Sequence, residues 1–326
     1  MNTLLLAPVF PTGPLSNGME ALSLPVGVVL AAALLVTVLI LVWLADRKRQ
    51  APRPRHRGID TYRRFLAEHD GEPDLLRHTL SARERTLAEL AARPPRSSFQ
   101  PDHDQFQINL RRGRPEPGLD PRMLWLLATA KANQAERFAV GLAEVYGRMQ
   151  IGVDERVLLH IHLQETYHTR LLAEVVSIFG LTVSPRPPAR AIRLFINCLV
   201  FTPPEWMLPL TGASEMVGCV LFRAMRDLGC ALFRNEPEVA DRIRALYDQI
   251  LADEIGHVGY IAARLGPMRR RLMRRIYLWI GPRMVAQMPE LGRLYPQTEW
   301  RQRLGAFDLE EMVTECHGLA YAAAIP

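Results

Sequence analysis

The sequence reads Gln164-Glu-Thr-Tyr-His168 at one point and Asp253-Glu-Ile-Gly-His257 at another, so a glutamate is twice followed three residues later by a histidine. In a helix, residues i and i+3 lie on one face, so each copy can hold a metal ion between a carboxylate and an imidazole. A single copy is common by chance on a solvated helix face. Two copies in separate apolar helices favour a metal site, because buried acids are costly unless they are paired or bind metal.

A solitary glutamate precedes each copy by one predicted helical hairpin. Glu136 precedes the turn at Gly152 by nearly as many residues as Glu165 follows it, and the second hairpin shows the same balance. At about 1.5 Å per residue, both members of a hairpin then return to nearly the same height. The predicted metal ligands, which are also the predicted catalytic residues, are Glu136, Glu165, His168, Glu215, Glu254 and His257.

The helical periodicity around these residues predicts an all-α fold. The order is helix, short turn, helix, long crossover, helix, short turn and helix. The long helices are expected at residues 122–150, 154–179, 211–234 and 237–265, with a short apolar helix near 189–201 in the crossover. Short turns make antiparallel neighbours, and a long connection after the second helix is typical of the ferritin-like four-helix bundle.

Residues 22–45 carry no charge and are almost wholly apolar, which is long enough for a transmembrane helix. A buried core helix is the alternative. The flank at 46–57 is rich in Arg and Lys, and by the positive-inside rule that side faces the cytoplasm. We therefore expect a single-pass membrane protein with a short extracytoplasmic N-terminus at 1–21 and a cytoplasmic catalytic domain. The basic flank would contact anionic lipid, since no nucleic-acid-binding motif accompanies it.

The remaining segments are expected to be accessory. Residues 46–121 are predicted to form a basic linker and accessory helices, with two helical pieces at 59–93 and an extended loop at 94–121. Residues 266–326 are predicted to form a basic amphipathic helix and a tail. That helix either lies on a membrane or packs on the bundle, and the pattern does not separate the two.

Residues 122–265 resemble the ferritin-like di-iron carboxylate superfamily of oxygenases and oxidases. The Asp-Glu-x-x-His string is similar to that of aminobenzoate-type N-oxygenases and membrane quinone hydroxylases. The sequence departs from those N-oxygenases at Ile250, where they place a histidine. The resemblance implies that Asp253 receives the ring N–H of His168. It also implies an oxygen pocket one turn after Glu215, at Gly218 and Cys219.

The expected cofactors are two iron ions, with manganese or a mixed iron and manganese pair as alternatives, and dioxygen as co-substrate. The expected function is hydroxylation, desaturation or N-oxygenation of a small organic substrate, and a lipophilic one would be natural if the basic helix after residue 266 lies on a membrane. The sequence holds no haem, flavin or iron–sulfur motif, so a separate electron donor, a reductase or a ferredoxin, is expected as partner besides membrane lipid. Two alternatives stay open: a ferritin- or rubrerythrin-like metal oxidase or peroxidase, and a non-enzymatic membrane scaffold.

The composition restricts the class of protein. Hydrophobic residues make up 48% and charged residues 23% of the chain, a balance typical of globular proteins. The four cysteines form no CxxC pair, so a zinc ribbon or a thioredoxin-type site is not expected. Cys219 and Cys230 are expected on one helix, too far apart for a disulfide.

Overall fold

The computed structural model describes residues 75–93, 95–148, 155–183 and 204–308. All regular secondary structure in these ranges is α-helical, which confirms the predicted all-α class. None of the helices within the described ranges combines the length and apolarity that crossing a bilayer requires. The predicted span at 22–45, like the predicted helix near 189–201, lies outside the described residues.

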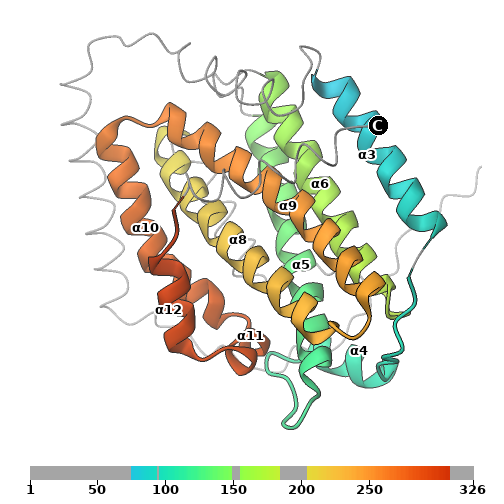
Figure 1. The fold of residues 1–326 in the computed structure, drawn as a ribbon. Coiled ribbons are helices and arrows are strands. Elements are labelled where there is room, and N and C mark those ends of the chain that lie inside the picture. Colours follow the sequence, from blue (N-terminus) through green and yellow to red (C-terminus); the bar gives the residue numbers. More distant parts are fainter. Residues whose placement is uncertain (1–74, 94, 149–154, 184–203, 309–326) are drawn as a thin grey trace, which may run out of the picture. The chain divides into compact units, whose positions relative to one another are not determined.

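Four long helices form a bundle of two hairpins. They are α5 (Pro121–Arg148), α6 (Glu155–Ser177), α8 (Pro204–Leu232) and α9 (Pro237–Arg264). Helix α5 packs against α6 and α8 against α9, while α6 also contacts α9 and α5 contacts α8. Helices α6 and α8 run in the same direction, so α6 ends and α8 begins at opposite ends of the bundle (Figure 1). That arrangement requires the long connection that the sequence predicts between the hairpins.

Helix α8 is longer than predicted. It begins at Pro204 rather than at residue 211 and continues through Pro209. A proline inside a helix removes one backbone hydrogen bond, so the sequence predicts that this helix begins only after Pro209. Both Met207 and Pro209 are buried in the bundle, and the packing of this extra segment outweighs the lost hydrogen bond.

One end of the bundle is closed by aromatic side chains. Trp125 at the start of α5 is fully buried, and its ring centroid lies 5.7 Å from Phe233 and 6.2 Å from Phe179. Its indole N–H donates to the backbone carbonyl of Met225 in α8 over 2.8 Å. Buried indoles carry a polar atom that needs a partner, and this bond ties the first hairpin to the second.

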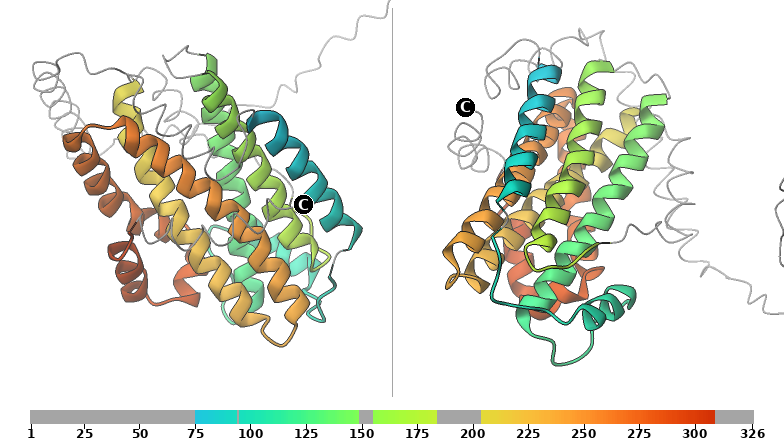
Figure 2. Two further views of the ribbon diagram at one scale, coloured as in Figure 1. Left: turned by 45° about the horizontal axis from the view of Figure 1, so that its top comes forward. Right: turned by 90° about the vertical axis from the view of Figure 1, so that its right-hand side faces the viewer.

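Two helices precede the bundle within the described residues. Helix α3 (Leu75–Ala92) lies beside α6, as both views in Figure 2 show. Helix α4 (His103–Arg111) stands in the segment 94–121, where the prediction of an extended loop is wrong. Asp102 caps α4 by accepting a hydrogen bond from the backbone N–H of Gln105 over 2.8 Å, and Phe106 and Leu110 are buried. The segment is rich in Pro, Gly and Arg, and this composition predicts a loop although the segment contains a short amphipathic helix.

After the bundle, the part of the chain described up to residue 308 forms three helices: α10 (Pro267–Ala286), α11 (Pro289–Leu294) and α12 (Gln297–Gly305). Helix α10 packs along α8, α11 against α5, and α12 against α10 and α8. The structure contains the predicted basic helix after residue 266. The prediction of a tail directly after this helix is wrong for residues 289–305, which form α11 and α12. Leu291 of α11 and both Trp300 and Leu304 of α12 are buried.

Candidate metal centre

The six predicted ligands meet inside the bundle. Helix α5 supplies Glu136, α6 supplies Glu165 and His168, α8 supplies Glu215, and α9 supplies Glu254 and His257. They form two groups in which one ligand atom from each residue lies within 4.8 Å of the others: Glu136, Glu165, His168 and Glu254; and Glu165, Glu215, Glu254 and His257. Two glutamates, Glu165 and Glu254, belong to both groups, so they lie where carboxylates would bridge two ions.

Each histidine turns one ring nitrogen toward these carboxylates. Nδ1 of His168 lies 3.3 Å from Oε2 of Glu136 and 3.3 Å from Oε1 of Glu254. Nδ1 of His257 lies 3.2 Å from Oε1 of Glu165 and 3.5 Å from Oε2 of Glu215. The two ring centroids are 6.0 Å apart, so each imidazole serves its own half of the cluster.

Nδ1 of His257 is the atom that fits a metal ion best. It is buried and has no hydrogen-bond partner in suitable geometry, although two carboxylates face it. Buried polar atoms in proteins are almost always hydrogen-bonded, so an exception needs an explanation. An imidazole nitrogen aimed at clustered carboxylates could serve as a metal ligand by its chemistry and its direction. The residues present therefore fit a metal centre.

Asp253 holds the opposite nitrogen of His168. Nε2 of His168 donates to Oδ2 of Asp253 over 3.0 Å, the contact that the resemblance implies. Arg83 in α3 donates to both oxygens of the same carboxylate, over 2.6 and 2.5 Å. Burial alone would raise the pKa of Asp253, but Arg83 and His168 hold the pKa well below its usual range. The carboxylate is therefore charged, and it orients the ring of His168 so that Nδ1 points at Glu136 and Glu254.

Gln164 does for His257 what Asp253 does for His168. Its Oε1 accepts a hydrogen bond from Nε2 of His257 over 3.0 Å. Its amide nitrogen donates to Oδ1 of Asp253 over 2.6 Å. Gln164 stands directly before Glu165, as Asp253 stands directly before Glu254. This role of Gln164 was not predicted, although Gln164 and Asp253 occupy matching positions in the two copies of the motif.

Arg83 is a second residue that sequence reasoning missed, and it lies outside the bundle. Its guanidinium carbon stands 4.8 Å from the centroid of the Tyr167 ring, besides its two bonds to Asp253. Arg170 in α6 pairs with Glu84, which holds the same stretch of α3 against the bundle. Helix α3 therefore covers the side of the cluster that α6 and α9 form. No local motif marks Arg83, since its partner is far away in the sequence.

The clustered acids shift one another's pKa values. Burial, with the nearby charge of Glu165, raises the pKa of Glu136 to about 8. Burial, with Glu215, Glu136 and Glu165, raises the pKa of Glu254 well above its usual value. Burial works against ionisation of Glu165 too, but His257 outweighs it and the pKa falls. The cluster therefore retains protons that metal ions would displace.

The two glutamates that belong to one group each are also the most accessible. The side chains of Glu136 and Glu215 are 13% and 16% exposed, whereas both histidines and both shared glutamates are buried. These two glutamates come from α5 and α8.

Of the two residues expected to line an oxygen pocket, Gly218 faces the cluster. A Cβ atom at this position would lie 3.2 Å from Oε2 of Glu254, so a larger residue would press on that carboxylate. Cys219 is fully buried, and no contact within the described residues places it at the cluster. As predicted, Cys219 and Cys230 are not joined by a disulfide. The pocket expectation now depends on Gly218.

Comparison of the chain with models of known protein families, with curated proteins and with solved structures gives no match. The site must therefore be interpreted from its own geometry.

Proposed function

We propose that this chain is a membrane-anchored oxidoreductase that binds two metal ions, iron above all, and uses dioxygen to hydroxylate, desaturate or N-oxygenate an organic substrate. The observation that carries the proposal is the pair of buried residue groups that share Glu165 and Glu254. Each group contributes one histidine, one glutamate of its own and both shared glutamates. Such a set suits two ions with carboxylates between them, as in ferritin-like di-iron proteins.

Charge balance favours metal ions over a network of protons alone. Four glutamates in one buried cluster repel one another, and burial of unpaired charge is costly. Two divalent cations would neutralise these four carboxylates fully. Each imidazole donates from Nε2, to Asp253 or to Gln164, so Nδ1 becomes the electron-pair donor once a metal ion displaces its proton. The hydrogen bonds behind the rings thus support metal binding in front of them.

The kinds of ligand atom favour iron or manganese. Both groups offer only carboxylate oxygen and imidazole nitrogen, and neither contains a cysteine. Thiolate ligands would favour zinc, copper or an iron–sulfur cluster, whereas mixed carboxylate and imidazole ligands suit iron and manganese. When bound, two ferrous ions would supply the electrons that activate dioxygen.

The surrounding residues support a reaction on one side of the centre. Arg83 and α3 close the side of the histidines, and Gly218 presents no side chain to Glu254, so we propose that oxygen arrives beside it. In a hydroxylation, one oxygen atom enters a C–H bond of the substrate and the other leaves as water, which consumes two electrons and two protons. Because the sequence has no redox motif of its own beyond the metal ligands, we propose a separate reductase or ferredoxin as donor.

The membrane part of the proposal depends on the apolar segment 22–45 and its basic flank. A reporter enzyme that works only in the cytosol, fused after Pro326, tests the orientation. We expect activity from this fusion and none from a reporter that works only outside the cytoplasm. The reverse pattern would contradict the proposed topology.

The reaction itself is tested on the full chain in detergent, loaded with ferrous iron without oxygen and then mixed with dioxygen. We expect rapid oxidation of two irons per chain, and continued oxygen uptake when a reductant is supplied. Glu254→Ala should abolish the reaction. Glu238→Ala removes an exposed acid from the same helix and should leave it intact. Iron-loaded protein that does not react with oxygen would overturn the proposal, and uptake driven only by added ferrous iron would favour a metal oxidase instead.

A further inference from the structure

The outer surface of α10 is unusually apolar. Four of the five large hydrophobic side chains that are exposed within the described residues belong to this helix: Met268, Leu278, Trp279 and Met284. Leu278 is 48% and Trp279 58% exposed. Single exposed hydrophobic residues are ordinary, but a group of them on one helix marks an interaction surface.

The orientation of α10 is fixed by its inner face. Met273, Tyr277, Gly281 and Val285, which follow one another at four-residue spacing, are buried. The hydroxyl of Tyr277 donates to the backbone carbonyl of Leu304 in α12 over 2.6 Å. A Cβ atom on Gly281 would lie 3.0 Å from Leu304 and 3.5 Å from Val217, so the helix sits close against α8 and α12. The exposed side chains therefore cannot turn inward.

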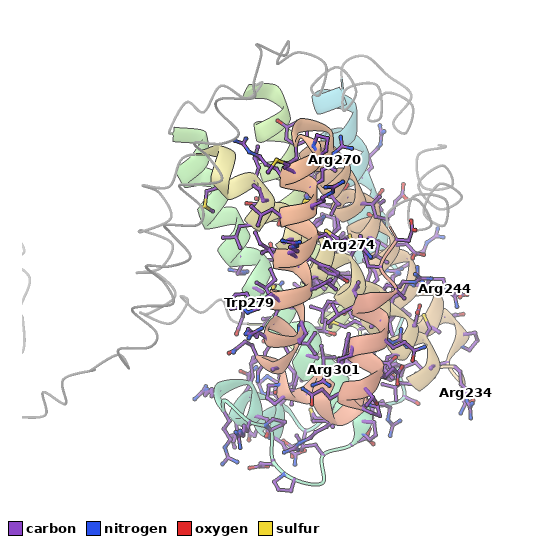
Figure 3. All side chains as sticks on the ribbon, turned by 90° about the vertical axis from the view of Figure 1, so that its left-hand side faces the viewer. Arg234, Arg244, Arg270, Arg274, Trp279 and Arg301 are labelled. Atoms are coloured by element: carbon purple, nitrogen blue, oxygen red, sulfur yellow. The ribbon has the colours of Figure 1, made fainter. Side chains whose placement is uncertain are left out.

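The same outer surface is strongly basic. Helix α10 contains six arginines and no acidic residue. Arg271, Arg275, Trp279 and Arg283 follow one another at four-residue spacing, two positions along from the buried row, and all are exposed. Figure 3 shows Arg270, Arg274 and Trp279 in succession along this helix. The guanidinium of Arg283 stacks on the Trp279 ring, 4.2 Å from its centroid.

We propose that this α10 face, made of Met268, Arg271, Arg275, Leu278, Trp279 and Arg283, docks on an anionic lipid surface. Arginines that flank Trp, Leu and Met fit phosphate groups above an apolar acyl layer, where Trp sits by preference. Nucleic acid fits the arginines but offers little to exposed Leu and Met side chains. The metal proposal is not needed for this inference, because none of these residues contacts the metal centre.

Lipid docking of α10 would give the chain a second membrane contact, remote in sequence from the proposed span at 22–45. Arg270 is not assigned to binding, since its Nε donates to the carbonyls of Ala262 and Leu265 over 2.7 and 3.1 Å and so ends α9. Arg271 and Arg275 are exposed and are assigned to headgroup binding, whereas Arg283 also donates to the backbone carbonyl of Trp279. Interfacial binding of this kind weakens as salt rises, because part of it is electrostatic.

The test uses the full chain reconstituted into vesicles of phosphatidylcholine brominated on its acyl chains, with or without phosphatidylglycerol. The contribution of Trp279 is the difference in fluorescence between the wild type and Trp279→Phe, which cancels the other tryptophans. We expect bromine to quench roughly half or more of this contribution in the anionic vesicles. Arg271→Gln with Arg275→Gln should remove most of the quenching. Arg234→Gln with Arg244→Gln, two exposed arginines elsewhere (Figure 3), should not change it.

A Trp279 contribution that bromine does not reach in anionic vesicles would overturn the proposal, as would quenching that survives loss of Arg271 and Arg275. Acrylamide quenching from the water gives a second measure on the same samples, and it should fall when anionic lipid is added. If lipid leaves acrylamide quenching unchanged but a nucleic acid or protein lowers it, the face binds that partner and lipid is excluded. Metal content should be equal in all variants, which separates this test from that of the proposed metal centre.

Discussion

The side-chain amide of Gln164 donates to Oδ1 of Asp253 over 2.6 Å, and this bond joins the outer partners of two histidines that stand on different helices. Through it, one hydrogen-bonded chain runs behind the centre from His257 to Arg83. Asp253 is charged and Gln164 is neutral, so the two halves of the centre are chemically unequal. A carboxylate partner makes an imidazole a stronger ligand, and we expect the half that holds His168 to bind metal more tightly.

Asp253→Asn should keep the fold but lower metal affinity by roughly 10- to 100-fold, the usual effect of losing such an outer carboxylate. The amide cannot match the charge that Arg83 and His168 now face. Competition with a chelator of known affinity measures the change. Asp248→Asn is the matched control, because Asp248 is another buried acid of α9, paired with Arg226 over 2.8 Å. Equal affinities for the two variants would contradict the role of Asp253.

Gln164→Leu should weaken the binding of one metal ion more than the binding of the other. The substitution removes the acceptor for Nε2 of His257, so that ring loses its fixed tautomer and orientation. A stepwise metal titration followed by calorimetry should show one tight site that is retained and one that is weakened. Equal loss at both sites would show that Gln164 acts on the whole cluster rather than on His257.

Gly218→Ala should bind two metals but react slowly with dioxygen. The new methyl group would stand 3.2 Å from Oε2 of Glu254, in the space proposed for oxygen. Stopped-flow mixing of the reduced protein with oxygen measures the rate. Gly259→Ala, in α9, has nothing within 4 Å of the new methyl and should react normally. It should also gain up to about 1 kcal/mol of stability from helix propensity. Identical oxygen kinetics in both variants would contradict the proposal that Gly218 lines the oxygen pocket.

The metal-free protein should lose stability as pH rises from about 6 to about 9. Burial and Glu165 raise the pKa of Glu136 to about 8. Burial lowers the pKa of His168, but Asp253 and Glu136 outweigh it and raise the pKa to about 10. The folded chain thus binds more protons than the unfolded chain in this window, so raising the pH favours unfolding. Thermal melting with a chelator present measures the trend, and a melting temperature that rises over this window would contradict it.

With metal bound, the stability of the protein should rise rather than fall as the pH increases. Ions displace the protons on Glu136 and Glu254, so metal affinity should increase as pH rises. Calorimetry in buffers of different ionisation enthalpy should show proton release on binding.

The sequence predicts much of the centre because its geometry is helical and local. Glu165 and His168 are three residues apart on one helix, and matched distances from the turns bring Glu136 level with them. The positions of the four bundle helices follow from periodicity, except for the start of α8. There the packing of Met207 and Pro209 outweighs the unfavourable effect of a proline inside a helix. These relations need no knowledge of how the hairpins pack, beyond the fact that they face each other.

The parts that the sequence does not predict depend on tertiary packing. Arg83 reaches Asp253 only because α3 docks beside α6, and no local pattern reports that. The fold of α11 and α12 likewise follows from burial of single residues such as Trp300 rather than from a long amphipathic pattern.

The number of metal ions bound per chain tests the central claim most directly. The full chain, purified from iron-replete cells and analysed by elemental analysis, should contain two ions per chain by the two ligand groups. Glu165→Ala removes a ligand that both groups share and should lose both ions, whereas Glu136→Ala removes a ligand of one group and should lose one. A folded wild-type chain that holds no metal and cannot be loaded with iron or manganese would contradict the account.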